Sequence, residues 1–223
     1  IKAIRTANPG AYTPRAGVTY PNGSFGSALQ TVAQVVKMEQ GLRIATVDFG
    51  GWDTHEAQAN GDGSGYLPDR LNALSQGLHA LYSDLVDYAG RLTILVMSEF
   101  GRRLGRNASN GTDHGHGNVM MVLGGNVNGG KIYGNWPGLT NLDQGQDLRI
   151  TTDYRAVLGE VIYKRLGNPN LGTIFPGFTS AQFTQLGLVN GGAGPINWSA
   201  ASVDVAPEQA GGDMPYRLFV PLA

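Results

Sequence analysis

The sequence contains no cysteine among its 223 residues. Disulfide frameworks, thiolate metal sites and cysteine nucleophiles are therefore excluded for this chain. Charge is also scarce, because only 15% of the residues are charged and the formal net charge is −1. No basic stripe is present to bind nucleic acid, and no apolar run approaches the ~20 residues that cross a bilayer. We therefore expect neither a nucleic-acid partner nor a membrane span.

Glycine, in contrast, is abundant, with 34 residues. Since the apolar content is an ordinary 41%, these glycines predict long loops on a folded scaffold and not a disordered chain. The chain begins with Ile1 and not with Met, so we expect a mature or cleaved product. The length favours one main domain over residues 1–180, followed by an irregular C-terminal extension over residues 181–223.

Apolar residues at spacings of three and four, and short β-branched runs, predict alternating helices and strands. We expect strands over 43–49, 91–97 and 119–123, helices over 27–40, 68–89 and 153–166, and a weak strand near 216–220. Asp153 is expected to cap the last helix. A strand, a helix and a second strand in this order form a βαβ unit. The expected fold class is therefore α/β, with a mostly parallel sheet flanked by helices.

Polar side chains follow the predicted strands at their carboxyl ends, where parallel sheets collect their functional groups. These candidate residues are Asp53, His55, Glu99, Arg102, Asp113, His114 and His116. Imidazoles and carboxylates are the usual ligands of zinc and similar cations. We expect the two histidine-bearing loops to meet over one edge of the sheet and to hold a divalent metal, with zinc as the expected ion.

Each candidate also has an ordinary explanation. Asp53 can stabilise a turn through its own side chain, and Glu99 can pair with a nearby arginine. The loop over 113–116 can be a solvated, glycine-rich segment. For Arg102 the functional interpretation is a cation that binds a phosphate or sulfate group. His79 falls in the middle of a predicted helix, so we expect no special role for it.

Several separate sequence blocks resemble the signature of a bacterial family called domain of unknown function 1501. They are GGWDTH at 50–55, SEFGR at 98–102, GTDHGH at 111–116, the glycine pairs at 124–125 and 129–130 with Tyr133-Gly134, and TTDYR at 151–155. The blocks occur in the family's order and extend over residues 20–175. The sequence after residue 180 adds nothing to the resemblance.

The resemblance implies an alkaline-phosphatase-like fold, since this family is grouped with a superfamily of phosphatases, sulfatases and phosphoglycerate mutases that act through divalent metals. By that pattern Asp53 and His55 are the first pair of metal ligands, and His114 or His116 is a later one. Glu99-Phe100-Gly101 stands where the superfamily has Asp-His-Gly, so one histidine ligand of the second metal is absent. The N-terminal segment that carries the superfamily's Ser or Thr nucleophile also has no counterpart here, and relatives are considerably longer.

The implied function is a metal-dependent hydrolase of phosphate or sulfate esters, exported to the bacterial periplasm or secreted. A separate N-terminal polypeptide or a second copy of the chain would be its partner. The implied catalytic residues are His114, His116 and Arg102, and the implied metal ligands are Asp53, His55, Glu99 and Asp113. The alternative is a secreted binding or structural protein that keeps the fold without the chemistry, because fold alone does not determine function.

Overall fold

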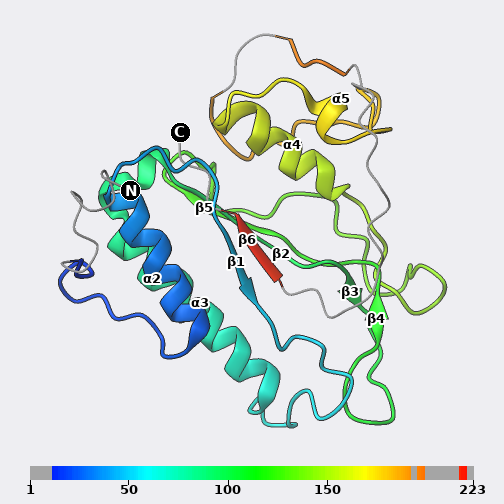
Figure 1. Ribbon diagram of the computed structural model, residues 1–223. Coiled ribbons are helices and arrows are strands. Elements are labelled where there is room, and N and C mark those ends of the chain that lie inside the picture. The colour runs from blue at the N-terminus through cyan, green and yellow to red at the C-terminus, as the bar shows by residue number, and fades with distance from the viewer. Residues whose placement is uncertain (1–11, 192–194, 199–215, 220–223) are drawn as a thin grey trace.

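A four-stranded sheet forms the centre of the computed structural model, which describes residues 12–191, 195–198 and 216–219 (Figure 1). Its strands follow the order β1-β6-β2-β5. Their bounds are Thr46–Phe49 for β1, Thr93–Met97 for β2, Met121–Gly124 for β5 and Tyr216–Phe219 for β6. A separate two-stranded sheet pairs β3 (Gly101–Arg102) with β4 (His114–Gly115).

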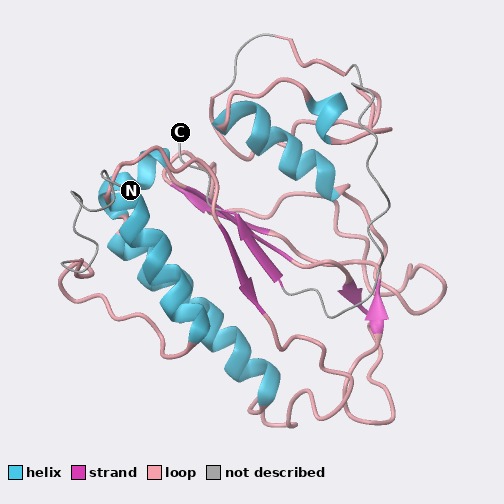
Figure 2. Cartoon of the chain, viewed as in Figure 1, coloured by secondary structure: helices cyan, strands magenta, loops and turns pink. Residues whose placement is uncertain are grey.

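Two long helices, α2 (Ser24–Lys37) and α3 (Tyr66–Asp84), pack side by side against one face of the sheet (Figure 2). Val47 and Phe49 of β1 are buried on this face, whereas Thr46 and Asp48 are exposed, as the two-residue period of a strand requires. Phe49 stacks on Phe25 of α2 with ring centroids 4.1 Å apart. A 3-10 helix, η2 (Val86–Arg91), then leads from α3 to β2.

Helix α4 (Tyr154–Arg165) contributes to a second apolar cluster, and the short helix α5 (Leu171–Ile174) follows it. Leu95 of β2 belongs to this second cluster, while its neighbour Ile94 belongs to the first. Because successive residues of a strand point to opposite faces, β2 is covered on both sides. The predicted helices and strands thus occur within a few residues of their expected bounds. Asp153 caps α4 as predicted, accepting a hydrogen bond from the Arg155 backbone N–H at 2.8 Å.

The expected parallel pairing is not found among the described strands. Strand β6 pairs antiparallel with both β1 and β2, and β2 pairs antiparallel with β5. The strand-helix-strand unit does make β1 and β2 run in the same direction, since both oppose β6. Strands β1 and β2 are nevertheless not neighbours in the sheet, because β6 lies between them. The alkaline-phosphatase-like core stays a prediction.

Described residues beyond 180 pack into the body of the protein. Strand β6 lies inside the central sheet, and Leu188 and Val189 are buried against α4. These segments fall in the range that the sequence pattern assigned to an irregular extension. Among the described helices, none combines the length and the apolar character needed to cross a membrane, as expected.

Glu160 of α4 has a fully buried side chain that holds the 186–189 segment. Its carboxylate accepts backbone hydrogen bonds from Leu186 at 2.6 Å, Gly187 at 3.0 Å and Val189 at 3.3 Å. Lys164, one turn further along α4, donates to it at 3.0 Å. A buried carboxylate needs such donors, because an unpaired charge in the interior is strongly destabilising.

We expect Glu160→Gln to lower the free energy of unfolding by about 3 kcal/mol, since the amide replaces acceptor oxygen with donor groups and leaves Lys164 unpaired. Urea denaturation followed by circular dichroism measures this change. Glu39→Gln is the matched control, because Glu39 forms an exposed ion pair with Arg91 whose loss costs under about 1 kcal/mol. Equal losses for the two variants would show that Glu160 does not stabilise this segment.

Candidate metal centre

The carboxyl ends of β1 and β2 lie at the same edge of the sheet. Phe49, the last residue of β1, pairs with Tyr216, and Met97, the last residue of β2, pairs with Arg217. After β1 the chain enters the turn over 50–55, and after β2 it continues into β3, whose partner β4 carries His114. The two loops that the sequence predicted to meet are therefore directed to one place.

The turn after β1 is held by its neighbours in the sequence and on α3. Gly51 has a φ of 82°, a left-handed conformation that favours glycine. Arg70 of α3 lies over the ring of Phe49 at 4.1 Å and donates to the carbonyl of Gly50. Trp52 packs against the apolar cluster beneath the helices, in edge contact with Phe49, whereas Asp53 and His55 contact the segment that carries His114.

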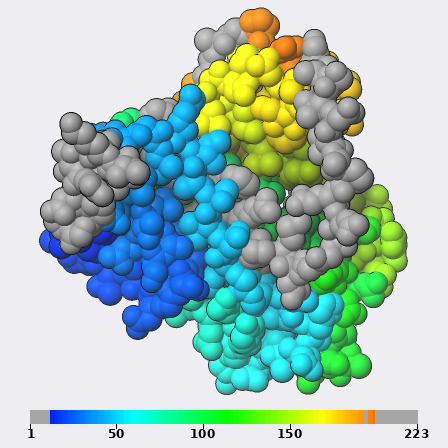
Figure 3. All heavy atoms as spheres, in the orientation of Figure 1, coloured from blue at the N-terminus to red at the C-terminus, as the bar shows by residue number. Residues whose placement is uncertain are grey.

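Backbone hydrogen bonds join this turn to the loop before β4. Ala57 N–H donates to Ser109 at 2.9 Å, and Thr112 N–H donates to Thr54 at 3.2 Å. Gly111 lies so close to the turn that an added Cβ would be 2.2 Å from the carbonyl carbon of His55. In the space-filling view the segment after β1 and the segment near residue 110 meet at the molecular surface (Figure 3).

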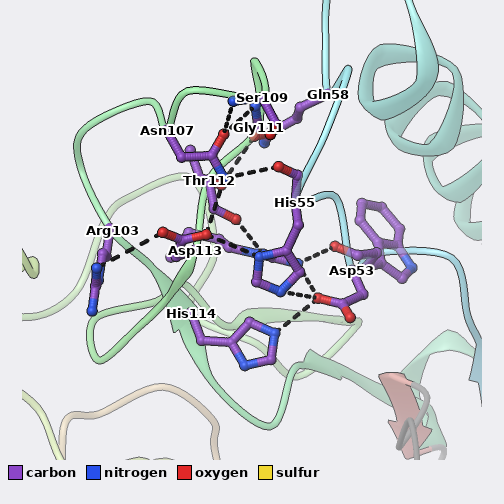
Figure 4. Close-up of polar contacts among 12 residues, drawn as sticks. Asp53, His55, Gln58, Arg103, Asn107, Ser109, Gly111, Thr112, Asp113 and His114 are labelled. Atoms are coloured by element: carbon purple, nitrogen blue, oxygen red, sulfur yellow. Dashed lines mark hydrogen bonds and ion pairs between the residues drawn. The ribbon is translucent and has the colours of Figure 1, made fainter.

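Asp53, His55 and His114 form a compact group of potential ligands (Figure 4). One ligand atom from each lies within 4.8 Å of the others. Asp53 Oδ1 is 2.8 Å from His114 Nε2 and 3.0 Å from His55 Nε2, and the two imidazole centroids are 4.7 Å apart. Both rings are directed toward the same carboxylate oxygen.

This set of donor atoms fits a zinc-type cation. Two imidazole nitrogens and one carboxylate oxygen are the three protein ligands expected of a catalytic zinc, which binds each at about 2 Å. Ligand atoms about 3 Å apart are consistent with a shared ion at those distances. All three side chains are 44–46% exposed, so a further coordination position would face solvent or substrate.

The charge state of Asp53 also suits a ligand. The hydrogen bond with His114 lowers the pKa of Asp53; slight burial opposes this, while the His55 charge and the Arg102 hydrogen bond lower the pKa further. The carboxyl is therefore ionised at neutral pH.

Arg102 ties the two loops together. Its guanidinium donates to the carbonyl of Thr112 at 2.5 Å, to the carbonyl of Trp52 at 2.6 Å and to Asp53 Oδ1 at 3.1 Å. Three of its five N–H donors are thus used within the protein. The sequence suggested a cation that grips a phosphate or sulfate group, whereas the observed contacts give Arg102 a positioning function. Its binding to an anion stays a prediction.

A comparison with protein-family models decides the family. The model described as "Protein of unknown function (DUF1501)" matches residues 8–152. The chain belongs to this family. The match contains β1, α3, β2 and both loops of the candidate centre, so the resemblance seen in the sequence blocks is confirmed. A search of curated proteins found no match, and a search of solved structures also found none.

Phe100 packs against the ring of His114 in the candidate metal centre of this DUF1501 chain. The two rings stack with centroids 3.7 Å apart and planes 25° apart. This stacking restricts the rotation of His114 and keeps Nε2 directed at Asp53. The sequence identified Phe100 only as a replacement for a superfamily histidine, because nothing in the pattern near residue 100 indicates what it contacts.

Asp113 and Glu99 do not belong to the ligand group, although both were predicted as ligands. Asp113 Oδ1 is 3.0 Å from His55 Nδ1, so it lies on the opposite side of the ring from Asp53. Glu99 is exposed and outside the group of ligand atoms. The sequence could not separate these carboxylates, because their order along the chain does not specify which ring nitrogen each one meets.

His116 also lies outside the ligand group and contacts a different loop. Its Nδ1 is 2.8 Å from Asp143, and its Nε2 is 3.7 Å from the buried Asp147. Arg103 lies 3.8 Å from Asp113 and 4.0 Å from Asp147. It therefore connects the surroundings of His55 with those of His116. The sequence analysis missed both Asp143 and Asp147. Their spacing of four residues in a glycine-containing loop was the available signal.

Proposed function

We propose that this DUF1501 chain binds a divalent metal, with zinc as the expected ion, and acts as a metal-dependent hydrolase of phosphate or sulfate esters. The observation that carries the proposal is the convergence of Asp53, His55 and His114, with one ligand atom from each inside a 4.8 Å group. The proposed ligands do not include Glu99 or Asp113. Export to the bacterial periplasm or the cell exterior, and a partner that is a separate polypeptide or a second copy, belong to the same proposal.

When bound, the metal would polarise an ester oxygen and lower the pKa of a bound water. The chain's own residues prepare the site for this chemistry. Phe100 and Asp113 hold the His114 and His55 rings so that Nε2 of each faces Asp53. Arg102 keeps the two loops at a constant separation. The guanidinium groups of Arg102 and Arg103 add positive charge beside the centre, which favours an anionic ester over a neutral one.

Zinc titration tests the metal centre. We expect the purified chain to bind one zinc ion, and His114→Gln to weaken that binding more than about 100-fold, because removal of a ligand costs more than the 10–100-fold of a supporting residue. Competition with a chromophoric chelator measures the affinity. His79→Gln is the matched control, since His79 is exposed on α3, and it is expected to leave the affinity unchanged.

Hydrolysis of p-nitrophenyl phosphate and p-nitrophenyl sulfate tests the chemistry. A chelator should abolish turnover, added zinc should restore it, and His114→Gln should not be restored. Zinc binding without hydrolysis of either ester would reject the hydrolase and leave the metal centre standing. Absence of zinc binding would reject both.

A binding or structural function is the second candidate, and exposed apolar side chains favour it. Ile132 is 99% exposed and Trp136 is 70% exposed. Further exposed apolar residues on the same part of the chain are Leu139, Ile150 and Tyr154. Contiguous exposed apolar patches mark interaction surfaces, and these residues are the candidates for such a patch in this chain. This candidate becomes the better explanation if the zinc titration is negative.

A further inference from the structure

We infer that Asn107 and Asp113 form a positioning pair that sets the tautomer of His55, so that His55 Nε2 is free to bind the metal. The inference rests on the proposed metal centre and extends it to two residues that would not touch the ion. It assigns Asp113 a different task from the ligand role that its sequence position suggested.

Asn107 uses its whole hydrogen-bonding capacity at this point. Its amide Nδ2 donates to the carbonyl of His55 at 2.8 Å and to Asp113 Oδ1 at 3.0 Å. Its Oδ1 accepts from the backbone N–H groups of Ser109 and Gly111, both at 3.0 Å. An amide has two donor hydrogens and two acceptor lone pairs, so all four are engaged. A flipped amide would lose every one of these bonds, and the orientation is therefore unambiguous.

The position of Asp113 then determines which nitrogen of His55 carries hydrogen. Both ring nitrogens of His55 lie 3.0 Å from a carboxylate, but only the contact of Nδ1 with Asp113 has the geometry of a hydrogen bond. An ionised carboxylate only accepts hydrogen bonds, so this bond makes Nδ1 the donor. In the neutral imidazole the lone pair is consequently on Nε2, the nitrogen that faces Asp53. Metal-binding histidines are commonly oriented in this way by a carboxylate on the other nitrogen.

The contacts of Asp113 agree with this arrangement. Its Oδ1 atom accepts from Asn107 Nδ2 at 3.0 Å and lies 3.0 Å from His55 Nδ1. Because Asn107 also binds the His55 carbonyl, one side chain places both the backbone and the ring partner of the same histidine. This amide thus joins two loops more than fifty residues apart, in addition to the contacts of Arg102.

Asn107→Asp separates positioning from simple loop support. The new carboxylate can still accept from Ser109 and Gly111, so the turn of the loop is kept. It cannot donate to Asp113 or to the His55 carbonyl, because a carboxylate oxygen replaces the amide nitrogen that donates both hydrogen bonds. Asp113→Ala is the second variant, because it removes the oxygen atom that accepts from both His55 Nδ1 and Asn107. Asn128→Asp is the matched control, since Asn128 donates to the carbonyl of Gly187 in a different part of the chain.

The experiment uses the full chain, zinc chloride as the probe, and ¹⁵N NMR of the imidazoles. We expect Asn107→Asp and Asp113→Ala to weaken zinc binding about 10–100-fold, and Asn128→Asp to leave it unchanged. In zinc-free protein at about pH 8.5, above the ordinary histidine range, His55 should carry its hydrogen on Nδ1, and both variants should shift it toward Nε2.

The two proposals fail in different ways. Unchanged zinc affinity and unchanged His55 ¹⁵N shifts in both variants would overturn the positioning pair while the metal centre stands. If the wild-type chain binds no zinc, the metal centre fails, and the zinc-free spectra still decide the tautomer. A wild-type His55 with hydrogen on Nε2 would overturn the positioning pair by itself.

Discussion

Asp84→Ala is expected to lower the free energy of unfolding by about 3–5 kcal/mol, the usual loss when one partner of a buried ion pair is removed. The Asp84 side chain is 0% exposed and lies at the end of α3. Its carboxylate accepts hydrogen bonds from Tyr12, from Tyr20 at 2.9 Å, from the Arg15 backbone at 2.6 Å and from Lys37. Removal of the carboxylate leaves these groups unpaired and detaches the segment before α2 from α3.

The Asp84 carboxylate also makes the free energy of unfolding depend on pH. Burial raises the pKa of Asp84, but the hydrogen bonds from Lys37, Tyr12, Arg15 and Tyr20 outweigh burial and hold the pKa below its ordinary range. A group with a lowered folded pKa stabilises the protein above its unfolded pKa, about 4 for Asp, and this stabilisation is lost as the pH falls through the folded pKa. The stability difference between wild type and Asp84→Asn should therefore be constant near neutral pH and shrink below about pH 4.

Urea denaturation at several pH values measures both effects. Asp87→Ala is the matched control, since Asp87 is 73% exposed and forms an ion pair with Arg15 at the surface. Its loss should cost less than about 1 kcal/mol. If Asp84→Ala costs no more than Asp87→Ala, the buried carboxylate is not a main contact of the N-terminal segment.

Gly111→Ala is expected to destroy the metal centre. The added Cβ would lie 2.2 Å from the carbonyl carbon and 2.3 Å from the carbonyl oxygen of His55, and both are backbone atoms that cannot rotate away. The loop that carries His114 must then separate from the turn that carries Asp53 and His55. We expect zinc affinity to fall more than about 100-fold, beyond the usual loss for a supporting residue, and unfolding free energy to fall by about 1–3 kcal/mol from overpacking.

Chelator competition and urea denaturation of the same preparations test this expectation. Gly105→Ala is the control from the same segment, because a Cβ at that position meets no atom within 4 Å. A folded Gly111→Ala chain with wild-type zinc affinity would contradict the close approach of the two loops as the basis of the centre.

The sequence predicted the regular elements well because their signals are local. Apolar spacing along residues 24–37 and 66–84 reflects the side of each helix that is buried, and short β-branched runs mark β1, β2 and β5. Strand β6 had only a weak signal, and its place between β1 and β2 depends on pairing between segments far apart in the chain. The parallel sheet was therefore the wrong expectation for the described strand pairs, although the common direction of β1 and β2 was correct.

Part of the candidate centre was also predictable. Strands that run in the same direction end at the same sheet edge, which brought the turn with Asp53 and His55 to the loop with His114. The buried carboxylates Asp84 and Glu160 were not predictable, since a polar residue on a helix is usually exposed and their hydrogen-bond donors are distant in sequence.

The sequence by itself determined the family, the order of the helices and strands, and the two loops that supply the site. These depend on local patterns and on the direction of the chain. Only the tertiary structure decided that His114 and not His116 faces Asp53. It also decided that Asp113 contacts Nδ1 of His55, the ring nitrogen on the side opposite Asp53. That choice depends on the orientation of each ring, which is set by Phe100, Asn107 and the β3–β4 pairing through contacts a few ångströms long between distant segments.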